Sequence, residues 1–244
     1  MLFYVGVPKS GSSSLTQIFN DSGSIRRFRW PDLVRGGINE ERAKLIYSAF
    51  IQLDEADTDI PHIRRSFEAV RQEAADAGKT LVWADVNFVT SPFPTEALRR
   101  LHRLCPEARV MVSIREQAAA ILSIYRSQAF YLRSVHDKLT RVRLSFREWA
   151  EFVLSNHTGE RAMGNLSHHQ EAQYLRIADY SRLHDILKRA FEGKPITYAP
   201  LELLKADPGA YFATVYGAIG QKINPDITDN YRVIGSNQTS MANR

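Results

Sequence analysis

The sequence has little cysteine and no long hydrophobic run. Its 244 residues include one cysteine, Cys105, so no disulfide bond can form within the chain. The cysteine and the histidines do not cluster at the spacing of a zinc site, so we expect no metal ion. No apolar stretch approaches the roughly 20 residues that a membrane-spanning helix needs. Because the first residues also lack the basic segment of a secretory leader, we expect a cytoplasmic protein with no transmembrane segment.

The overall composition is that of an ordinary globular protein, with 44% hydrophobic and 24% charged residues. A chain of this length is expected to form one domain, which we place at residues 1–244. The 32 lysines and arginines outnumber the 27 acidic residues and give a formal net charge of +5. This excess favours an anionic ligand and does not require nucleic acid as a partner.

Short runs of β-forming residues alternate along the chain with longer segments of helical spacing. The runs cover residues 2–7, 81–85, 109–114 and 195–199. This alternation predicts an α/β protein with three layers, α/β/α, around a central parallel sheet. The expected helices cover residues 13–21, 40–52, 63–77, 95–104, 117–133, 146–155, 168–191 and 208–219.

The turn between the first expected strand and the first helix has the sequence PKSGSSSL at residues 8–15. Backbone N–H groups and the positive end of the helix dipole converge at such a turn, so it predicts an anion site. A serine-rich helix cap is the ordinary alternative. In the ATP-binding pattern G-x-x-x-x-G-K-[ST] the lysine follows the second glycine, whereas here Lys9 precedes Gly11. That inverted order argues against a kinase and against a required Mg²⁺ ion.

The loop resembles the 5′-phosphosulfate loop of sulfotransferases that use 3′-phosphoadenosine 5′-phosphosulfate (PAPS), whose pattern is approximately P-K-[ST]-G-[ST]-[ST]-x-L. That family also has an arginine at the end of a later strand and a serine eight residues further on. Arg115 and Ser123 have this spacing. A planar guanidinium at the end of a parallel strand faces the ligand crevice and suits a phosphate. Residues 196–208 are similar to the family's C-terminal strand and turn, which we take as support for the fold only.

The resemblance implies a P-loop NTPase-like sulfotransferase fold. It implies that a sulfuryl group moves from PAPS to a hydroxyl or amine of a small-molecule, lipid or carbohydrate acceptor. Adenosine 3′,5′-bisphosphate is then the product, and no metal takes part. Lys9 would stabilise the charge that develops on the leaving group. The residues implied to bind the cofactor are Lys9, Ser10, Gly11, Ser12, Ser13, Ser14, Arg115 and Ser123.

An acceptor hydroxyl also needs a general base within hydrogen-bonding reach. Asp85 ends the second expected strand, at the edge of the sheet where ligands gather, and is our candidate. The motif E-K-[ST]-P-x-Y of glycan-modifying members is absent near this position. His62, His102 and His136 therefore remain alternative bases.

Two other functions and the nature of the acceptor stay open at this stage. The chain could be a P-loop kinase, or a non-catalytic module that keeps the nucleotide pocket without a base. Six basic residues within 126–147 would suit an anionic or sugar acceptor, although a solvated helix face is the commoner role of such a segment. Trp30, Trp83 and Trp149 would suit a hydrophobic acceptor, although core packing is their commoner role. The sequence leaves the oligomeric state open.

Overall fold

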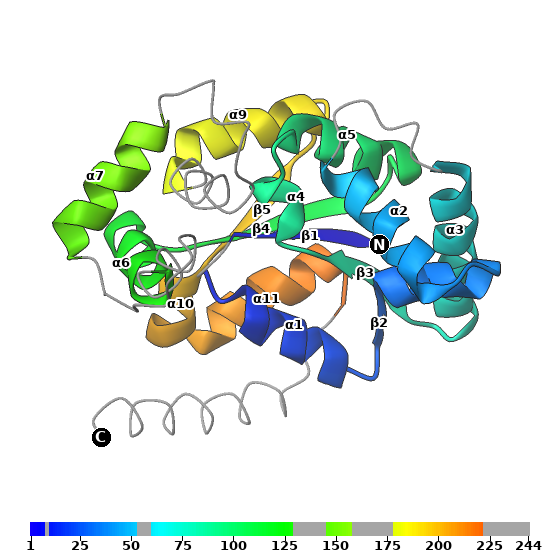
Figure 1. The fold of residues 1–244 in the computed structure, drawn as a ribbon. Coiled ribbons are helices and arrows are strands. Elements are labelled where there is room, and N and C mark those ends of the chain that lie inside the picture. The colour runs from blue at the N-terminus through cyan, green and yellow to red at the C-terminus, as the bar shows by residue number, and fades with distance from the viewer. Residues whose placement is uncertain (8–9, 53–59, 129–144, 158–177, 222–244) are drawn as a thin grey trace, which may run out of the picture.

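The structure is a computed structural model that describes residues 1–7, 10–52, 60–128, 145–157 and 178–221 (Figure 1). Its centre is a five-stranded sheet with the order β2-β3-β1-β4-β5. Every neighbouring pair of strands in this sheet is parallel. The strands are β1 (Leu2–Gly6), β2 (Ile25–Phe28), β3 (Thr80–Ala84), β4 (Arg109–Ile114) and β5 (Ile196–Pro200).

Helices cover both faces of the sheet, which confirms the predicted three-layer α/β/α fold (Figure 1). One face carries α1 (Ser12–Asp21) and α11 (Pro208–Ile219), and the other carries α2 (Glu40–Gln52), α3 (Ile60–Asp76), α4 (Asn87–Thr90), α5 (Pro94–Leu104) and α9 (Tyr180–Ala190). The remaining helices are α6 (Gln117–Gln128), α7 (Phe146–His157), α10 (Leu201–Ala206) and a 3-10 helix, η1 (Trp30–Gly36). Among the described residues, no helix combines the length and hydropathy needed to cross a membrane.

Strand β1 lies at the centre of the sheet, and this position explains why its sequence is a continuous apolar run. Leu2 and Tyr4 pack among the side chains of α1 and α11, whereas Phe3 and Val5 pack on the opposite face. All four are at most 1% exposed. A strand that is buried on both faces cannot alternate apolar and polar residues, so it appears as one hydrophobic block.

Strand β2 was absent from the sequence prediction because its sequence, IRRF, places two arginines in the middle. Ile25 and Phe28 are buried, while the arginines are half-buried at the edge of the sheet. The Arg26 guanidinium forms an ion pair with the Asp32 carboxylate at 2.6 Å. The partner that makes Arg26 acceptable in a strand thus comes from η1 and not from the strand's own sequence.

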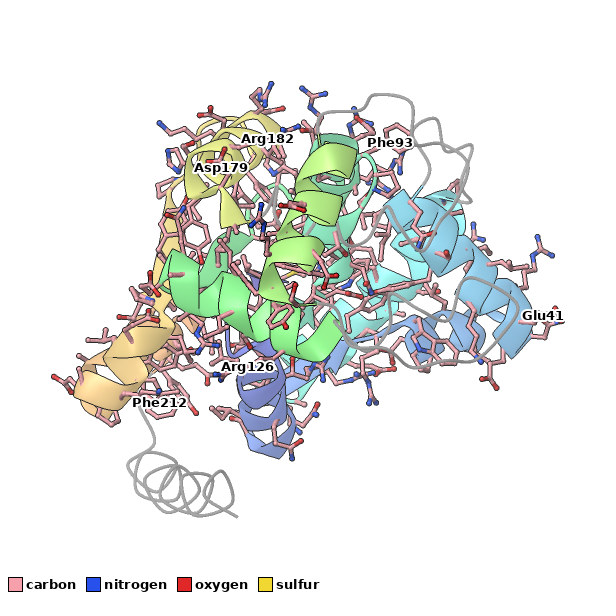
Figure 2. The ribbon with its side chains drawn as sticks, turned by 60° about the vertical axis from the view of Figure 1, so that its left-hand side comes forward. Glu41, Phe93, Arg126, Asp179, Arg182 and Phe212 are labelled. Carbon is pink, nitrogen blue, oxygen red and sulfur yellow. The ribbon has the colours of Figure 1, made fainter. Side chains whose placement is uncertain are left out.

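The helix predicted over residues 168–191 was wrong as a continuous element. Helix α9 begins at Tyr180, because Asp179 is extended and its carboxylate accepts a hydrogen bond from the Arg182 N–H at 3.2 Å. Asp179 and Arg182 lie together at the start of this helix (Figure 2). The short helices α4, α10 and η1 escaped prediction because so few residues show no helical period.

The strand order places the ends of β1, β3 and β4 next to one another. From β1 the chain passes to β2 at one edge, returns to β3, and then crosses β1 to reach β4. Ligands of open parallel sheets bind at such a point of reversal, outside the carboxyl ends of the strands. These strands are followed by the segment predicted to bind phosphate (residues 8–15, called the phosphate loop below), by Asp85 and by Arg115.

Candidate active site

The phosphate loop leads into α1 through Gly11, which adopts a left-handed conformation with φ 82°. The Leu15 N–H donates to the Gly11 carbonyl at 3.1 Å and closes the first turn of the helix. Gly11 has no side chain with which to cap the N–H groups of that turn. The first turn of α1, with the sequence SSSL, contains no acidic residue. The positive end of α1 is therefore available to an anion.

Leu201 closes the back of the phosphate loop. A Cβ atom built on Gly11 would lie 2.6 Å from the Leu201 Cδ1 atom. Leu201 is the first residue of α10 and follows β5 directly, so the end of β5 supports the loop that follows β1. Glycine is required at position 11 for its positive φ angle, and the close approach of Leu201 adds to that requirement.

Ser10 directs its hydroxyl into the protein. It is fully buried, donates to the Val7 carbonyl at 2.6 Å, and lies 2.7 Å from the Ser113 hydroxyl. Ser113 is in turn 2.6 Å from the Tyr4 hydroxyl. Burial raises the pKa of Tyr4, so the phenol stays protonated. This hydrogen-bonded chain ties the loop to β1 and β4, and the Ser10 hydroxyl serves the fold of the loop.

The family resemblance implies that Lys9 stabilises the charge on the leaving group. Lys9 and Pro8 lie outside the described residues. Ser12, Ser13 and Ser14 form the first turn of α1, as the loop pattern requires. Their roles and that of Lys9 remain predictions.

Arg115 and Ser123 occupy the elements that the sequence predicted. Arg115 follows β4 and is half-buried, and Ser123 is a half-buried residue in the second turn of α6. The Arg115 backbone is clamped by Tyr180, whose hydroxyl accepts from the Arg115 N–H at 3.0 Å and donates to the Arg115 carbonyl. Tyr180 had no signal in the sequence, because it is one tyrosine at the start of an amphipathic helix.

Two glutamates fix the turn between β4 and α6. The Glu116 carboxylate accepts from the N–H groups of Ala118 and Ala119 at 2.9 and 2.6 Å and thereby caps the helix. These backbone hydrogen bonds lower the pKa of Glu116. The Glu116 N–H donates to the Glu202 carboxylate at 2.9 Å, so α10 holds this turn as well as the phosphate loop.

Asp85 follows β3 and lies beside β1, where its N–H donates to the Tyr4 carbonyl at 3.2 Å. One carboxylate oxygen accepts a hydrogen bond from the Tyr47 hydroxyl, and the other accepts from the Asn87 N–H at 2.8 Å. Burial raises the pKa of Asp85, while these hydrogen bonds and the charge of Arg27 oppose that rise. A raised pKa makes a carboxyl group better suited to proton transfer near neutral pH.

Tyr47, on α2, is itself held by Trp83. The Trp83 Nε1 atom donates to the Tyr47 hydroxyl at 3.1 Å, and the two rings stack with centroids 6.0 Å apart. Burial, followed by the neighbouring Asp85 carboxylate, raises the pKa of Tyr47. The phenol is therefore a donor to Asp85 at neutral pH.

The alternative bases lie elsewhere in the fold. His62 on α3 is buried and its Nε2 atom is 3.0 Å from the Leu33 carbonyl. His102 on α5 packs edge-on against Phe191 at 5.7 Å between ring centroids. Both histidines take part in packing the helices, and His136 lies outside the described residues.

The three tryptophans differ in exposure. Trp83 and Trp149 are each 1% exposed and belong to packed aromatic clusters. Trp30 is half-buried and lies under the Lys44 ammonium, 4.7 Å from the ring centroid. Of the basic segment, Arg126 is exposed at the end of α6 (Figure 2) and Arg147 is exposed on α7, whereas residues 129–144 lie outside the described ranges.

In the part of the chain that the structure describes, no three histidine, cysteine, aspartate or glutamate side chains are grouped to hold a metal ion. Cys105 is buried, and burial raises the pKa of its thiol to about 12. A thiol with so high a pKa is not a nucleophile at neutral pH.

Comparison with known proteins assigns the chain to a family. A sequence model described as the sulfotransferase family matches residues 2–185. A search of curated proteins found no match. Among solved structures, the fold is similar to the crystal structure of a sulfotransferase from Alicyclobacillus acidocaldarius, with a TM-score of 0.54. The sequences are 18% identical, over 96% of this chain and 90% of that chain, so this likeness concerns the fold alone.

Proposed function

The chain belongs to the sulfotransferase family, and we propose that it transfers a sulfuryl group from PAPS to a hydroxyl or amine of a small-molecule, lipid or carbohydrate acceptor. The observation that supports this best is the placement of three sequence features at one edge of the sheet. The phosphate loop follows β1, Arg115 follows the neighbouring strand β4, and Asp85 follows β3 on the other side.

The residues present fit a nucleotide with two anionic ends. When bound, PAPS supplies an activated sulfuryl group on its 5′-phosphate and a separate 3′-phosphate. The uncapped N-terminus of α1 suits the first of these groups, because backbone N–H donors and the helix dipole both favour an anion there. The guanidinium of Arg115 suits the second, and Ser123 on the following helix would add a hydroxyl donor.

Lys9 would neutralise the charge that builds on the bridging oxygen of the leaving nucleotide. An ammonium group placed at a developing negative charge stabilises the transition state more than the ground state. In this assignment the Ser10 hydroxyl has a structural role and does not contact the nucleotide, because it is buried and holds the loop to β4 through Ser113.

Asp85 would take the proton from the acceptor hydroxyl. Asp85 follows β3, which is the neighbour of β1 in the sheet, and burial raises its pKa. A base must be ionised to accept a proton, so activity should rise as the pH increases through the pKa of Asp85.

The decisive first experiment measures nucleotide binding by thermal stabilisation, with EDTA or Mg²⁺ present. Adenosine 3′,5′-bisphosphate at 100 times its Kd should add about 2.7 kcal/mol to the stability of the protein, with or without Mg²⁺. ATP should add nothing. Stabilisation by ATP that requires Mg²⁺ would instead support a kinase and reject this proposal.

The second experiment uses ³⁵S-labelled PAPS with a panel of phenols, lipid alcohols, sugars and amines. Transfer of label to one class supports the proposal and identifies the acceptor. Binding of adenosine 3′,5′-bisphosphate with no transfer to any class would reject the enzyme and favour a non-catalytic nucleotide-binding module.

A further inference from the structure

A second ionisable side chain stands directly behind Asp85. Tyr47 comes from α2, whereas Asp85 follows β3, and 38 positions separate them in the sequence. The two form a chain of directed hydrogen bonds in which Trp83 donates to Tyr47 and Tyr47 donates to Asp85. The chain starts in the protein core, since Trp83 is 1% exposed and packs against Phe50 at 5.8 Å between ring centroids.

The hydrogen bonds fix the carboxylate and still leave it able to accept another. The Tyr47 hydroxyl occupies one lone pair of the first oxygen, and the Asn87 N–H occupies one lone pair of the second. The Asn87 side chain donates to the carboxylate as well. A carboxylate has about four acceptor positions, so these three donors do not exhaust them. Asp85 can therefore receive a hydrogen bond from an acceptor hydroxyl while its orientation is held from two sides.

We propose that Tyr47 is a positioning residue for the general base, orienting the Asp85 carboxylate and favouring its ionised form. This inference rests on the proposed function, in which Asp85 takes the acceptor's proton. Tyr47 does not touch the reacting atoms, and it acts through Asp85 alone.

The charged and titratable groups around Asp85 determine the direction of the expected effect. Arg27 faces it from β2 and Tyr47 faces it from α2, and a further cation, Arg29, acts on Arg27. Burial favours the neutral carboxyl, whereas Tyr47, Asn87 (through both its N–H and its side chain) and Arg27 favour the ionised carboxylate. Removing the Tyr47 hydroxyl takes away one of the opposing contributions, so the pKa of Asp85 should rise further.

The first test needs no acceptor and no nucleotide. Carboxyl ¹³C chemical shifts are titrated by NMR in the wild-type protein, in Tyr47→Phe and in Asp85→Asn, the last of which assigns the Asp85 signal. Tyr47→Phe should move the Asp85 titration to higher pH. Tyr198→Phe is the matched control, because its hydroxyl lies 2.6 Å from His184 Nδ1 on the β5 side of the sheet and should leave Asp85 unchanged.

A second variant tests the same bond with the side chain kept in place. Replacing Tyr47 by 3-fluorotyrosine makes the phenol a stronger donor, so the Asp85 titration should move to lower pH. Opposite shifts in the two Tyr47 variants support the proposal. An Asp85 titration that is unchanged in both variants would overturn it.

The kinetic test uses the acceptor found with labelled PAPS and follows kcat/KM against pH. Tyr47→Phe should shift the acidic limb to higher pH and lower kcat/KM by about tenfold below neutral pH, the scale of a lost hydrogen bond to a charged group. Asp85→Asn should remove the limb together with most of the activity. If Asp85→Asn retains the wild-type profile, the assignment of the base fails. If Asp85→Asn is inactive and Tyr47→Phe has the wild-type profile, only the role of Tyr47 is overturned.

Discussion

The proposed donor end and the proposed base end of the site are constructed in different ways. At the donor end, the pattern PKSGSSSL covers eight consecutive residues of the sequence after β1, while Arg115 directly follows β4 and Ser123 lies on the next helix. At the base end, Asp85 follows β3, whereas Tyr47 comes from α2 and Arg27 from β2. The donor end is encoded in local sequence, whereas the base end is assembled from separate parts of the chain.

The difference follows from what each end must recognise. Phosphate groups have a fixed shape and charge, and a strand–loop–helix turn supplies N–H donors through its backbone. The turn works with small residues and one glycine, and therefore has a recognisable pattern. A base depends on burial and on neighbouring side chains for its pKa, and these neighbours need only be close in space. Substitutions at the donor end should thus change nucleotide affinity or turnover without moving the titration of Asp85.

The largest effect is expected for Lys9→Ala. Turnover should fall by about 10²–10³-fold, the loss found when one donor to a developing charge is removed. The pKa of Asp85 should stay unchanged, as expected if the donor end and the base end act independently. Single-turnover rates with labelled PAPS measure the effect, and Lys79→Ala, an exposed lysine before β3 at the opposite edge of the sheet, is the control. Turnover near that of the wild type would remove Lys9 from the mechanism.

Arg115→Ala should weaken binding of adenosine 3′,5′-bisphosphate by about 1.5–3 kcal/mol, the range for a hydrogen bond to a charged group. Adenosine 5′-phosphosulfate, which lacks the 3′-phosphate, should bind almost as before. Isothermal calorimetry with both nucleotides measures the difference. The control is Arg109→Ala at the other end of β4, where the guanidinium donates to the Gly217 carbonyl at 3.0 Å. Equal losses for the two nucleotides would show that Arg115 acts on the fold and not on the 3′-phosphate.

Gly11→Ala should lower stability by about 1–2 kcal/mol, the cost of a left-handed conformation for a residue with a Cβ atom. It should also weaken nucleotide binding, because the N-terminus of α1 is displaced. Gly37→Ala is the matched control: its φ is 84°, and a Cβ there would meet nothing within 4 Å. Chemical denaturation should show a larger stability loss for Gly11→Ala than for Gly37→Ala, because only the former also meets Leu201, and only Gly11→Ala should lose affinity. Adding Leu201→Ala to Gly11→Ala should relieve the contact with Leu201 and leave the backbone strain.

The smallest effect is expected for Tyr180→Phe, which removes the hydroxyl that clamps the Arg115 backbone. The hydroxyl makes two neutral hydrogen bonds, each contributing about 0.5–1.5 kcal/mol, and only part of their loss should reach the Arg115 guanidinium, so affinity for adenosine 3′,5′-bisphosphate should fall a few-fold. Tyr198→Phe removes a hydroxyl on the same face of the sheet and should leave the affinity unchanged. An unaltered affinity in Tyr180→Phe, measured by the same calorimetry, would mean that the clamp does not place Arg115.

By itself, the sequence determined the fold class, four of the five strands and the elements that carry the donor residues. These features have local causes: a strand buried on both faces must be continuously apolar, and a turn that leads into a helix N-terminus needs small residues and a positive φ angle. Strand β2 and the start of α9 were missed because an ion pair from η1 and a cap at Asp179 override the local pattern.

Only the tertiary structure decided which groups surround these residues. It turned Ser10 toward Ser113, placed Leu201 behind Gly11, and set Tyr180 against Arg115. It also brought Tyr47 to Asp85, across the connection between α2 and β3. No spacing rule links such residues, because contacts between elements depend on how the helices pack on the sheet. A pKa depends on the same contacts, so the pKa of Asp85 could not be predicted from its position at the end of a strand.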